Sequence, residues 1–577
     1  MTQPAALSTA TRSDALESLA STEVDVLVIG GGVVGAGAAM DAATRGLRTA
    51  IVEAQDWASG TSSRSSKLIH GGLRYLEMLD FGLVRESLHE RSLLLNRIAP
   101  HLVQPVPFLY PLAHRVWERS YVGTGVLLYD TLAATAPERQ RMPRHRHLTR
   151  RGALAQAPCL RPDGLTGAVQ YWDAQVDDAR FTATLVRTAA SYGALAANRV
   201  QATEFLRSGD AVVGARLLDV DTGRVIEARA RQVINATGVW TGDLQAPGPQ
   251  AGAPRVRASK GVHLVVPRER LRSATGIIVR TERSVLFVIP WRRHWIIGTT
   301  DTDWDLGKDQ PTASARDIDY LLEHVNEILA EPLSRDDVVA VYAGLRPLLA
   351  GGAEGVGATA KLSREHTVSR VAPGLVMVAG GKFTTYRVMA AQAVDEAAAA
   401  LGRDVPPSCT DRVPLVGAAG FFALWNRRHE LAAEHGMGVG QLEQLLHRHG
   451  DTVDQVLHLV DSAAVPGLDL DAALCGDLRY LRAEAVYAVT HEGARHLDDV
   501  LTRRTRLSIE VRDRGLRAAP VVAELIAPHL GWTRDDVERE LRQYRAAVAA
   551  ELDAEAEPDD QSAAAARRRA LEFPLSA

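Results

Sequence analysis

Short apolar runs separated by helical patterns dominate the first part of the chain. Residues 24–29 form a β-branched apolar run, which is typical of a buried strand. A glycine-rich turn follows, and small residues with helical spacing continue from position 36 until Gly46 ends the helix. Residues 49–53 form a second apolar run. This strand–helix–strand order predicts a parallel sheet covered by helices.

The pattern changes twice further along the chain. Strand-like runs crowd together between residues 255 and 300, which predicts an antiparallel sheet in a second unit. Buried strands that end in glycine return at residues 233–238 and 375–380. After residue 415, helical patterns separated by glycine and proline predict an all-α C-terminal domain.

Length and composition limit the class of protein. The chain has 577 residues, too many for one hydrophobic core, so two or three units are expected. A net charge of −4 gives no basic excess, so nucleic acid is not an expected partner. The three cysteines lack the spacing of a zinc or iron–sulfur site, and no metal is predicted. A disulfide framework is also not expected, which fits a reducing cytoplasm. We find neither a signal-peptide core nor an apolar stretch long enough to cross a bilayer, so any membrane contact is expected at the surface.

The first turn carries a dinucleotide-binding pattern, Gly30-x-Gly32-x-x-Gly35, between a strand and a helix. Gly30 permits the tight turn, Gly32 lets the backbone approach a pyrophosphate, and Gly35 allows close packing of helix on strand. The helix N-terminus favours phosphate, and Glu53 at the end of the second strand can accept hydrogen bonds from ribose hydroxyls. This pattern alone does not distinguish NAD from FAD.

Residues 61–75, TSSRSSKLIHGGLRY, are the most informative stretch of the chain. This stretch resembles the flavin-facing loop of the FAD-dependent glycerol-3-phosphate dehydrogenases of the aerobic, quinone-linked type. Arg64 departs from some members, which have a small residue there. Further motifs of the family follow in the same order within residues 23–400: KGVHLVVP at 260–267, GTTD at 298–301, AGLRPL at 343–348, SREH at 363–366 and GGKFTTYR at 380–387.

The resemblance implies FAD as the cofactor. It also implies that the serine-rich loop runs along the flavin, and that the turn at 235–238 and the helix start at 381–385 face the cofactor. The expected cofactor-binding residues are Gly30, Gly32, Gly35, Glu53, Thr61, Ser62, Ser65, Ser66, Lys67, His70, Gly72, Ala236, Thr237, Gly238, Gly381, Lys382, Thr384 and Thr385.

The implied substrate, sn-glycerol 3-phosphate, needs fixed positive charge for its phosphate. Arg346 and Arg364 are assigned to it, because a guanidinium binds phosphate oxygens bidentately and stays charged. Arg74 and Lys382 add charge near the flavin, and the family places Tyr75 beside Arg74 in the substrate pocket.

Oxidation of the secondary alcohol to the ketone needs a base and a hydride acceptor, and FAD supplies the second. His263 is the predicted base, since an imidazole pKa lies near neutrality, and His70 is the alternative. Lys260 is predicted to stabilise the developing alkoxide or the reduced flavin, and Arg346 completes the catalytic set. The alternative for His263 is a hydrogen bond within the sheet.

The predicted fold is an α/β FAD-binding Rossmann-like domain with an antiparallel β-sheet substrate/cap domain and an all-α C-terminal domain. The expected boundaries are a flexible lead at 1–22, a discontinuous FAD-binding domain at 23–99, 165–254 and 360–402, a substrate/cap domain at 100–164 and 255–359, a helical domain at 405–550, and a mobile tail at 551–577.

Reduced FAD must be reoxidised, and the family delivers its electrons to a membrane quinone. The implied location is therefore the cytoplasm, with peripheral association at the inner face of the plasma membrane. Six arginines and two histidines within residues 139–151 form either a lipid-binding patch or a solvated loop. Residues 421–425, FFALW, are either an interfacial anchor or helix core. A homodimer is compatible with the sequence.

Three other functions stay open. The first is a glycerol-3-phosphate oxidase that uses O2. The second is a related FAD-dependent dehydrogenase of 2-hydroxy acids or amino acids, in which a pocket arginine would bind a carboxylate. The third is a flavin-binding sensor or scaffold whose helical domain serves as a partner surface.

Overall fold

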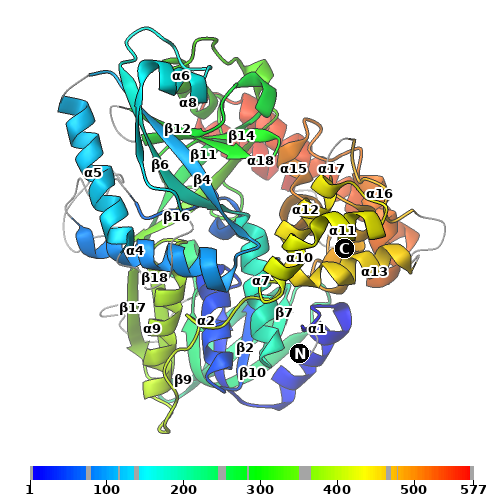
Figure 1. Cartoon of the computed structure of the whole chain (residues 1–577). Coiled ribbons are helices and arrows are strands. Elements are labelled where there is room, and N and C mark those ends of the chain that lie inside the picture. Colours follow the sequence, from blue (N-terminus) through cyan, green and yellow to red (C-terminus); the bar gives the residue numbers. More distant parts are fainter. Residues whose placement is uncertain are drawn as a thin grey trace.

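The chain folds around two large β-sheets, with the C-terminal helices packed beside both (Figure 1). The computed structural model describes residues 4–72, 80–114, 117–134, 142–244, 255–281, 285–349, 366–462, 469–476 and 479–571. Within these residues, no helix is both long and apolar enough to span a bilayer.

The first sheet carries the glycine-rich turn. Five of its strands run parallel, so their carboxyl ends meet at one edge, where the turn lies. Its strand order is β17 (His366–Ala372), β18 (Leu375–Gly380), β10 (Val225–Asn235), β1 (Val24–Ile29), β2 (Thr49–Glu53) and β7 (Leu195–Asn198), and β9 (Ala211–Asp219) with β8 (Val200–Ser208) extends it from β10.

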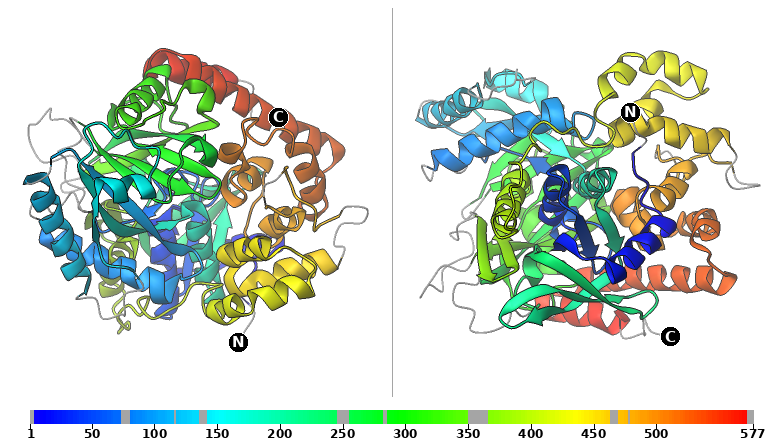
Figure 2. Two further views of the ribbon diagram at one scale, coloured as in Figure 1. Left: turned by 45° about the horizontal axis from the view of Figure 1, so that its top comes forward. Right: turned by 90° about the horizontal axis from the view of Figure 1, so that it is seen from below.

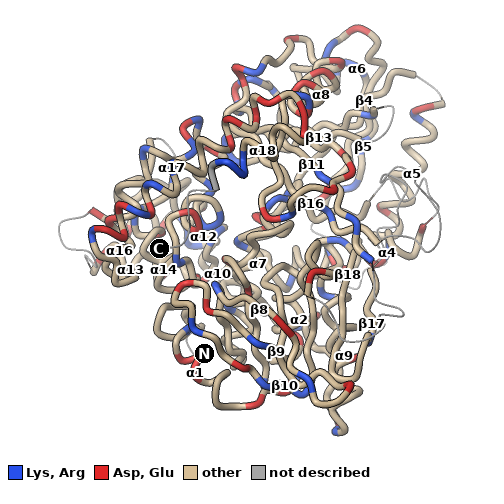
Figure 3. The backbone as a smooth tube through the Cα atoms, turned by 180° about the vertical axis from the view of Figure 1, so that it is seen from behind, with Lys and Arg blue, Asp and Glu red and all other residues tan. Residues whose placement is uncertain are grey.

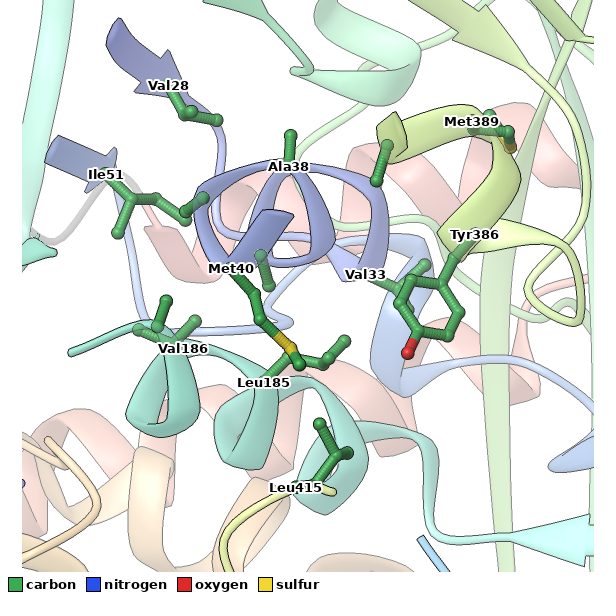
Figure 4. Packing of buried hydrophobic residues seen from close by; sticks show 14 of the residues in the cluster. Val28, Val33, Ala38, Met40, Ile51, Leu185, Val186, Tyr386, Met389 and Leu415 are labelled. Atoms are coloured by element: carbon green, nitrogen blue, oxygen red, sulfur yellow. The ribbon is translucent and has the colours of Figure 1, made fainter. Parts of the chain in front are cut away.

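Helix α2 (Val33–Thr44) packs between this sheet and two further helices, α7 (Asp178–Ser191) and α9 (Tyr386–Ala399). Figure 4 shows Met40 of α2 against Leu185, with Val28 and Ile51 on the strand side. Since α2 is built from small residues and is buried on nearly every side, its N-terminus is held rigidly at the sheet edge.

The second sheet is antiparallel except where β12 meets β4. One of its faces packs on α6 (Arg150–Gln156) and α8 (Ala315–Asn326), the other on α4 (Phe81–Leu93) and α5 (Trp117–Ala134). Its strand order is β15 (Thr302–Trp304), β11 (Val256–Pro267), β14 (His294–Gly298), β13 (Val285–Trp291), β12 (Gly276–Arg280), β4 (Val103–Leu112), β6 (Gly167–Val176) and β3 (Leu68–Ile69), with β16 (Ala340–Leu349) on β11 and β5 (Arg146–Thr149) on β6.

The C-terminal domain is helical (Figure 2). It has its own apolar core. Phe421 is buried in this core and Trp425 packs against it, so the FFALW segment is helix core. The helices are α10 (Phe421–Asn426), α11 (Arg428–Glu434), α12 (Val439–His449), α13 (Val453–Asp461), α14 (Arg482–Thr490), η8 (Asp499–Arg504), α15 (Leu507–Glu510), α16 (Ala519–Leu530), α17 (Arg534–Ala556) and α18 (Asp560–Leu571).

Three boundary predictions need correction. The expected flexible lead contains α1 (Thr9–Ser21), whose Leu16 and Leu19 are buried against the first sheet. The expected mobile tail contains the end of α17 and all of α18, which packs on α17. Strand β6, which the sequence assigned to the FAD-binding domain, pairs within the second sheet.

Candidate active site

A single cavity of about 2450 Å³ runs between the two sheets and the C-terminal helices. Its walls are the glycine-rich turn, the serine-rich loop, strands β11 and β16, the start of α9, and helix α17. Most of the predicted site residues that the structure describes lie along this wall. The cavity is large enough to take an extended cofactor.

The glycine-rich turn leaves its backbone open to the cavity. Gly30 has φ +112°, and a Cβ there would lie 2.6 Å from the Ala236 carbonyl oxygen. A Cβ on Gly35 would lie 1.9 Å from the Gly30 oxygen, so helix and turn approach as closely as glycine allows. Gly32 caps α2, whose N-terminus then faces the cavity and suits a pyrophosphate. Ala236, Thr237 and Gly238 line the cavity directly beside this turn.

Glu53 ends β2 and lines the cavity beside this turn. Its carboxylate accepts hydrogen bonds from Gly31 N at 2.6 Å and from Gln55 N at 2.8 Å. Burial raises the pKa of Glu53, although these backbone hydrogen bonds oppose the rise. The carboxylate therefore fixes the turn, and its placement fits the predicted contact with a ribose.

The serine-rich loop is held from three sides. Ser62 Oγ accepts from Val33 N at 2.9 Å, and Thr61 Oγ1 donates to the Leu345 oxygen at 2.6 Å. Ser65 donates to Asp178 Oδ2 from its backbone N at 3.0 Å and from its Oγ at 2.7 Å. These contacts present residues 61–66 to the cavity as a fixed row of hydroxyl and backbone groups.

Lys67 supports this loop from behind. Its ammonium donates to the Ser63 oxygen at 3.1 Å and to Asp178 at 2.9 Å, and its side chain is fully buried outside the cavity wall. Burial lowers its pKa to about 8. Arg506, from the C-terminal domain, binds the Ser63 oxygen and also Asp177 and Asp178. The predicted cofactor contact of Lys67 is thus replaced by a supporting role.

His263 and Ser66 meet at the centre of the cavity wall. Ser66 Oγ lies 2.8 Å from His263 Nε2, and the imidazole stacks on Tyr342 with ring centroids 4.7 Å apart. Tyr342 in turn donates to the Ser65 oxygen at 3.0 Å. Burial lowers the pKa of His263 well below 6.5, and the charges of Arg346 and Lys67 lower it further. The imidazole is therefore neutral at pH 7, as a base must be.

Arg346 reaches the same part of the cavity from β16. Its guanidinium donates to Thr299 Oγ1 at 3.0 Å and to the Thr300 oxygen at 3.2 Å, and it lies 3.6 Å from Asp301. These contacts orient the planar group without enclosing it. A fixed guanidinium beside a neutral imidazole suits an anionic substrate that must lose a proton.

The start of α9 closes the cavity at the other side. Gly381, Lys382 and Thr384 line it, and Thr384 Oγ1 accepts from His70 N at 3.2 Å. His70 also lines the cavity. Thr385 is the residue that precedes the first turn of α9, and neither Thr385 nor Gly72 belongs to the cavity wall.

Lys260 does not join the site. Its ammonium pairs with Asp317 at 2.6 Å and with Asp560 of α18, on the side of β11 away from the cavity. The reason is strand alternation, since neighbouring residues of a strand point to opposite faces and Gly261 and His263 face the cavity. Its predicted role at the alkoxide or reduced flavin is thus corrected to a structural one. Arg74, Tyr75 and Arg364 lie outside the described residues.

Tyr342, Asp178 and Arg506 contribute to the site although the sequence did not single them out. Tyr342, Gly344 and Arg346 alternate along β16, and Tyr342 is the register partner of His263 on β11, so the period-two pattern could have identified Tyr342. Asp178 and Arg506 are 328 residues apart, and no local pattern connects them. Arg64 lines the cavity, and burial lowers its pKa. Among the described residues, no group of three or more His, Cys, Asp or Glu could hold a metal ion.

Fold and site together define a flavoprotein oxidoreductase. Residues 25–396 match the sequence profile of the FAD dependent oxidoreductases, and residues 408–537 match that of the C-terminal domain of alpha-glycerophosphate oxidase. The site fits FAD, because the turn, the helix N-terminus and the serine-rich loop present glycine backbone and hydroxyl groups along one extended wall.

The chain belongs to the family of FAD-dependent glycerol-3-phosphate dehydrogenases and binds FAD. It is 52% identical over 561 residues to the glycerol-3-phosphate dehydrogenase of Mycobacterium leprae, covering 97% of this chain and 94% of that protein. It is 35% identical over 537 residues to the human mitochondrial glycerol-3-phosphate dehydrogenase, covering 90% and 72%. The glycerol-3-phosphate dehydrogenase of Bacillus halodurans, solved in complex with FAD, superposes with a TM-score of 0.75 at 28% identity, covering 95% of this chain and 98% of that one.

Proposed function

We propose that this protein oxidises sn-glycerol 3-phosphate to dihydroxyacetone phosphate and passes the electrons to a membrane quinone. The observation that carries the proposal is the pairing of a neutral His263 with the oriented Arg346 in the FAD cavity. The activity named for the relatives at 52% and 35% identity supports the same substrate.

His263 is the proposed base for the C2 hydroxyl. The reaction needs the tautomer with the proton on Nδ1, in which the Ser66 hydroxyl donates to Nε2 in the resting protein. The substrate hydroxyl would displace Ser66 and give its proton to Nε2. Stacking on Tyr342 keeps the ring in place during the transfer. FAD, when bound, supplies the acceptor for the C2 hydride.

Arg346 is the proposed partner of the substrate phosphate, and Lys382 adds positive charge at the start of α9. Arg74, Tyr75 and Arg364 complete the proposed substrate site on the strength of their motifs. Fixed cations bind phosphate in both ground and transition states, so they contribute mainly to substrate affinity and orientation.

A membrane surface is proposed at α5 and the neighbouring β5–α6 segment. Trp117, Tyr121 and Leu127 of α5 are 59%, 52% and 56% exposed and recur on one face of the helix. Helix α5 contacts β5 through the Arg119 bond to the Leu148 oxygen. Four exposed arginines lie in or next to the β5–α6 segment, where they would face anionic lipid: Arg144, Arg146, Arg150 and Arg151.

Anaerobic titration with sn-glycerol 3-phosphate tests the proposed substrate. The flavin absorption near ~450 nm should bleach with this substrate, but not with glycerol, lactate or an amino acid. Bleaching by lactate or an amino acid alone would replace the proposal with the dehydrogenase alternative. A flavin band that no substrate bleaches would favour the sensor or scaffold.

The electron acceptor is tested separately. Reduced protein should be reoxidised by a short-chain quinone much faster than by air, with little peroxide formed. Rapid reoxidation by O2 with stoichiometric peroxide would favour the oxidase alternative. The profile that residues 408–537 match is named for an oxidase, so this alternative is tested directly. Vesicles with anionic lipid should retain the protein at low salt, and Trp117→Ser with Tyr121→Ser should weaken that retention.

A further inference from the structure

A polar cluster joins the C-terminal domain to the edge of the FAD cavity. Asp221, in the turn between β9 and β10, accepts from Arg495 Nε at 2.7 Å and from Arg199 Nε at 3.0 Å. His496 Nε2 lies 3.4 Å from the same carboxylate. The other ring nitrogen, Nδ1, lies 2.8 Å from Glu540 of α17.

The position of the cluster follows from the direction of the cofactor. The pyrophosphate belongs at the turn after β1, and the flavin belongs toward the serine-rich loop and His263. The adenosine must then extend the other way, past Glu53 of β2 toward the neighbouring strand β7. The cavity wall continues there through residues 199–203 and 220–222, and Arg495, His496 and Glu540 line it from the C-terminal domain.

This cluster differs from the other contacts between the domains. Asp56 with Arg504, and Asp177 with Arg506, are buried ion pairs whose side chains are at most 9% exposed. His496 and Asp221 are 30% and 15% exposed. Figure 3 shows acidic and basic positions interspersed along α17, the helix that supplies Glu540. The buried pairs attach the C-terminal domain to the rest of the molecule. Within the cluster Glu540 is also buried, at 5% exposed, so the part that lies at the exposed edge and can open is the contact of Asp221 with Arg495 and His496.

We propose that Asp221, Arg495, His496 and Glu540 form a clasp through which the C-terminal helical domain retains the adenosine end of FAD. The ligand class is an adenosine diphosphate moiety. The clasp closes the cavity edge by linking the β9–β10 turn to the C-terminal domain, so loosening it speeds cofactor release without touching the chemistry at His263.

The charge of His496 strengthens the clasp in a defined pH range. Burial lowers its pKa, but the hydrogen bonds to Asp221 and Glu540, with the charges of Glu540 and Asp499, raise it to about 10. Opening the clasp removes Asp221 from His496 and so lowers this pKa, while Glu540 and Asp499 stay beside His496 in the C-terminal domain. Because the closed state holds the proton more tightly, the contribution of this charge is lost as the pH rises toward 10.

His496→Gln and Asp221→Asn test the clasp. Each should raise the Kd of FAD for the apoprotein and the rate of FAD release from the holoprotein by about tenfold, from the loss of a charge-assisted hydrogen bond. The double variant should be little worse than either single one. Flavin fluorescence measures both quantities without turnover.

Two half-cofactors locate the effect. ADP should bind the His496→Gln apoprotein about tenfold more weakly than wild type, while FMN binds equally well. His496→Arg keeps the charge and should keep FAD affinity, and it should remove the loss of FAD that wild type shows between pH 7 and 10. Arg270→Gln is the matched control, because its pair with Asp337 has similar exposure (37% and 16%) and lies outside the cavity wall.

Two results would overturn the clasp. One is a thermal unfolding temperature that falls in His496→Gln and Asp221→Asn while FAD and ADP affinities match wild type, since the cluster would then only join the domains. The other is an equal loss of FMN and ADP affinity. If His496→Gln does not fold, the comparison of wild type with His496→Arg across the pH range gives the same decision.

Discussion

The two faces of strand β11 differ in role, although the residues that they carry are close neighbours in the sequence. His263 faces the cavity, where it stacks on Tyr342 and meets Ser66. Lys260, three residues earlier in the same motif, faces the opposite way and pairs with Asp317 and Asp560. Both side chains are buried and both belong to the family motif. Only the one on the cavity face is placed to touch a substrate.

The difference teaches that a motif can serve two purposes at once. One face of β11 holds the proposed base at the flavin, and the other face fastens the C-terminal helix α18 to α8. Variants that affect the two faces should therefore separate kinetics from stability.

The largest expected effect is on the cavity face, at Arg346. Arg346→Ala should lower kcat/KM for sn-glycerol 3-phosphate by about 10² to 10³, mostly through KM, because a fixed cation for the phosphate is lost. Steady-state kinetics with a quinone analogue measures this, and the flavin spectrum shows whether FAD stays bound. Arg346→Lys keeps the charge but not the two-pronged guanidinium, so its kcat/KM should lie between those of wild type and Arg346→Ala. An unchanged KM would remove Arg346 from the substrate site.

The opposite face should respond in stability. Lys260→Met leaves Asp317 and Asp560 without their cation and should lower the free energy of unfolding by about 3 kcal/mol, as measured by urea denaturation. Arg370→Gln removes an exposed ion pair with Glu396 and should cost no more than about 0.5 kcal/mol. Equal effects of the two substitutions would show that the Lys260 contacts are not formed in solution.

The pH dependence sharpens the assignment of the base. The pKa of His263 is lowered well below 6.5, so the imidazole stays neutral from pH 8 down past 6.5. The rate constant for flavin reduction at saturating substrate should be constant over that range and fall only at more acidic pH, as the base becomes protonated. Stopped-flow absorbance measures it. An inflection at or above pH 7 would point to a different base.

Tyr342 should give the smallest effect. Tyr342→Phe keeps the stacked ring but loses the hydrogen bond to the Ser65 oxygen, so flavin reduction should slow by less than about tenfold. Tyr342→Ala also removes the stacking and should slow it further. If Phe and Ala behave alike, the hydroxyl and not the stacking positions His263.

Much of the fold could be predicted because local patterns determine it. The βαβ start, the glycine-rich turn and the motif order identify both the sheet and the cofactor. The Lys260 role was wrong although the information was present, since period-two alternation separates Lys260 from Gly261 and His263. The tail could not be predicted from its pattern. Helix α18 is poor in large apolar residues, and it packs through Ala563 and Ala566 and through the long-range contact between Asp560 and Lys260.

The most direct test compares one variant from each face in the anaerobic half-reaction. His263→Asn and Lys260→Met are loaded with FAD, mixed with sn-glycerol 3-phosphate without oxygen, and followed by flavin absorbance. His263→Asn should be reduced at least about 10²-fold more slowly than wild type, while Lys260→Met stays within about twofold. Near-normal reduction of His263→Asn, or a large loss in Lys260→Met with FAD bound, would contradict the assignment of chemistry to the cavity face of β11.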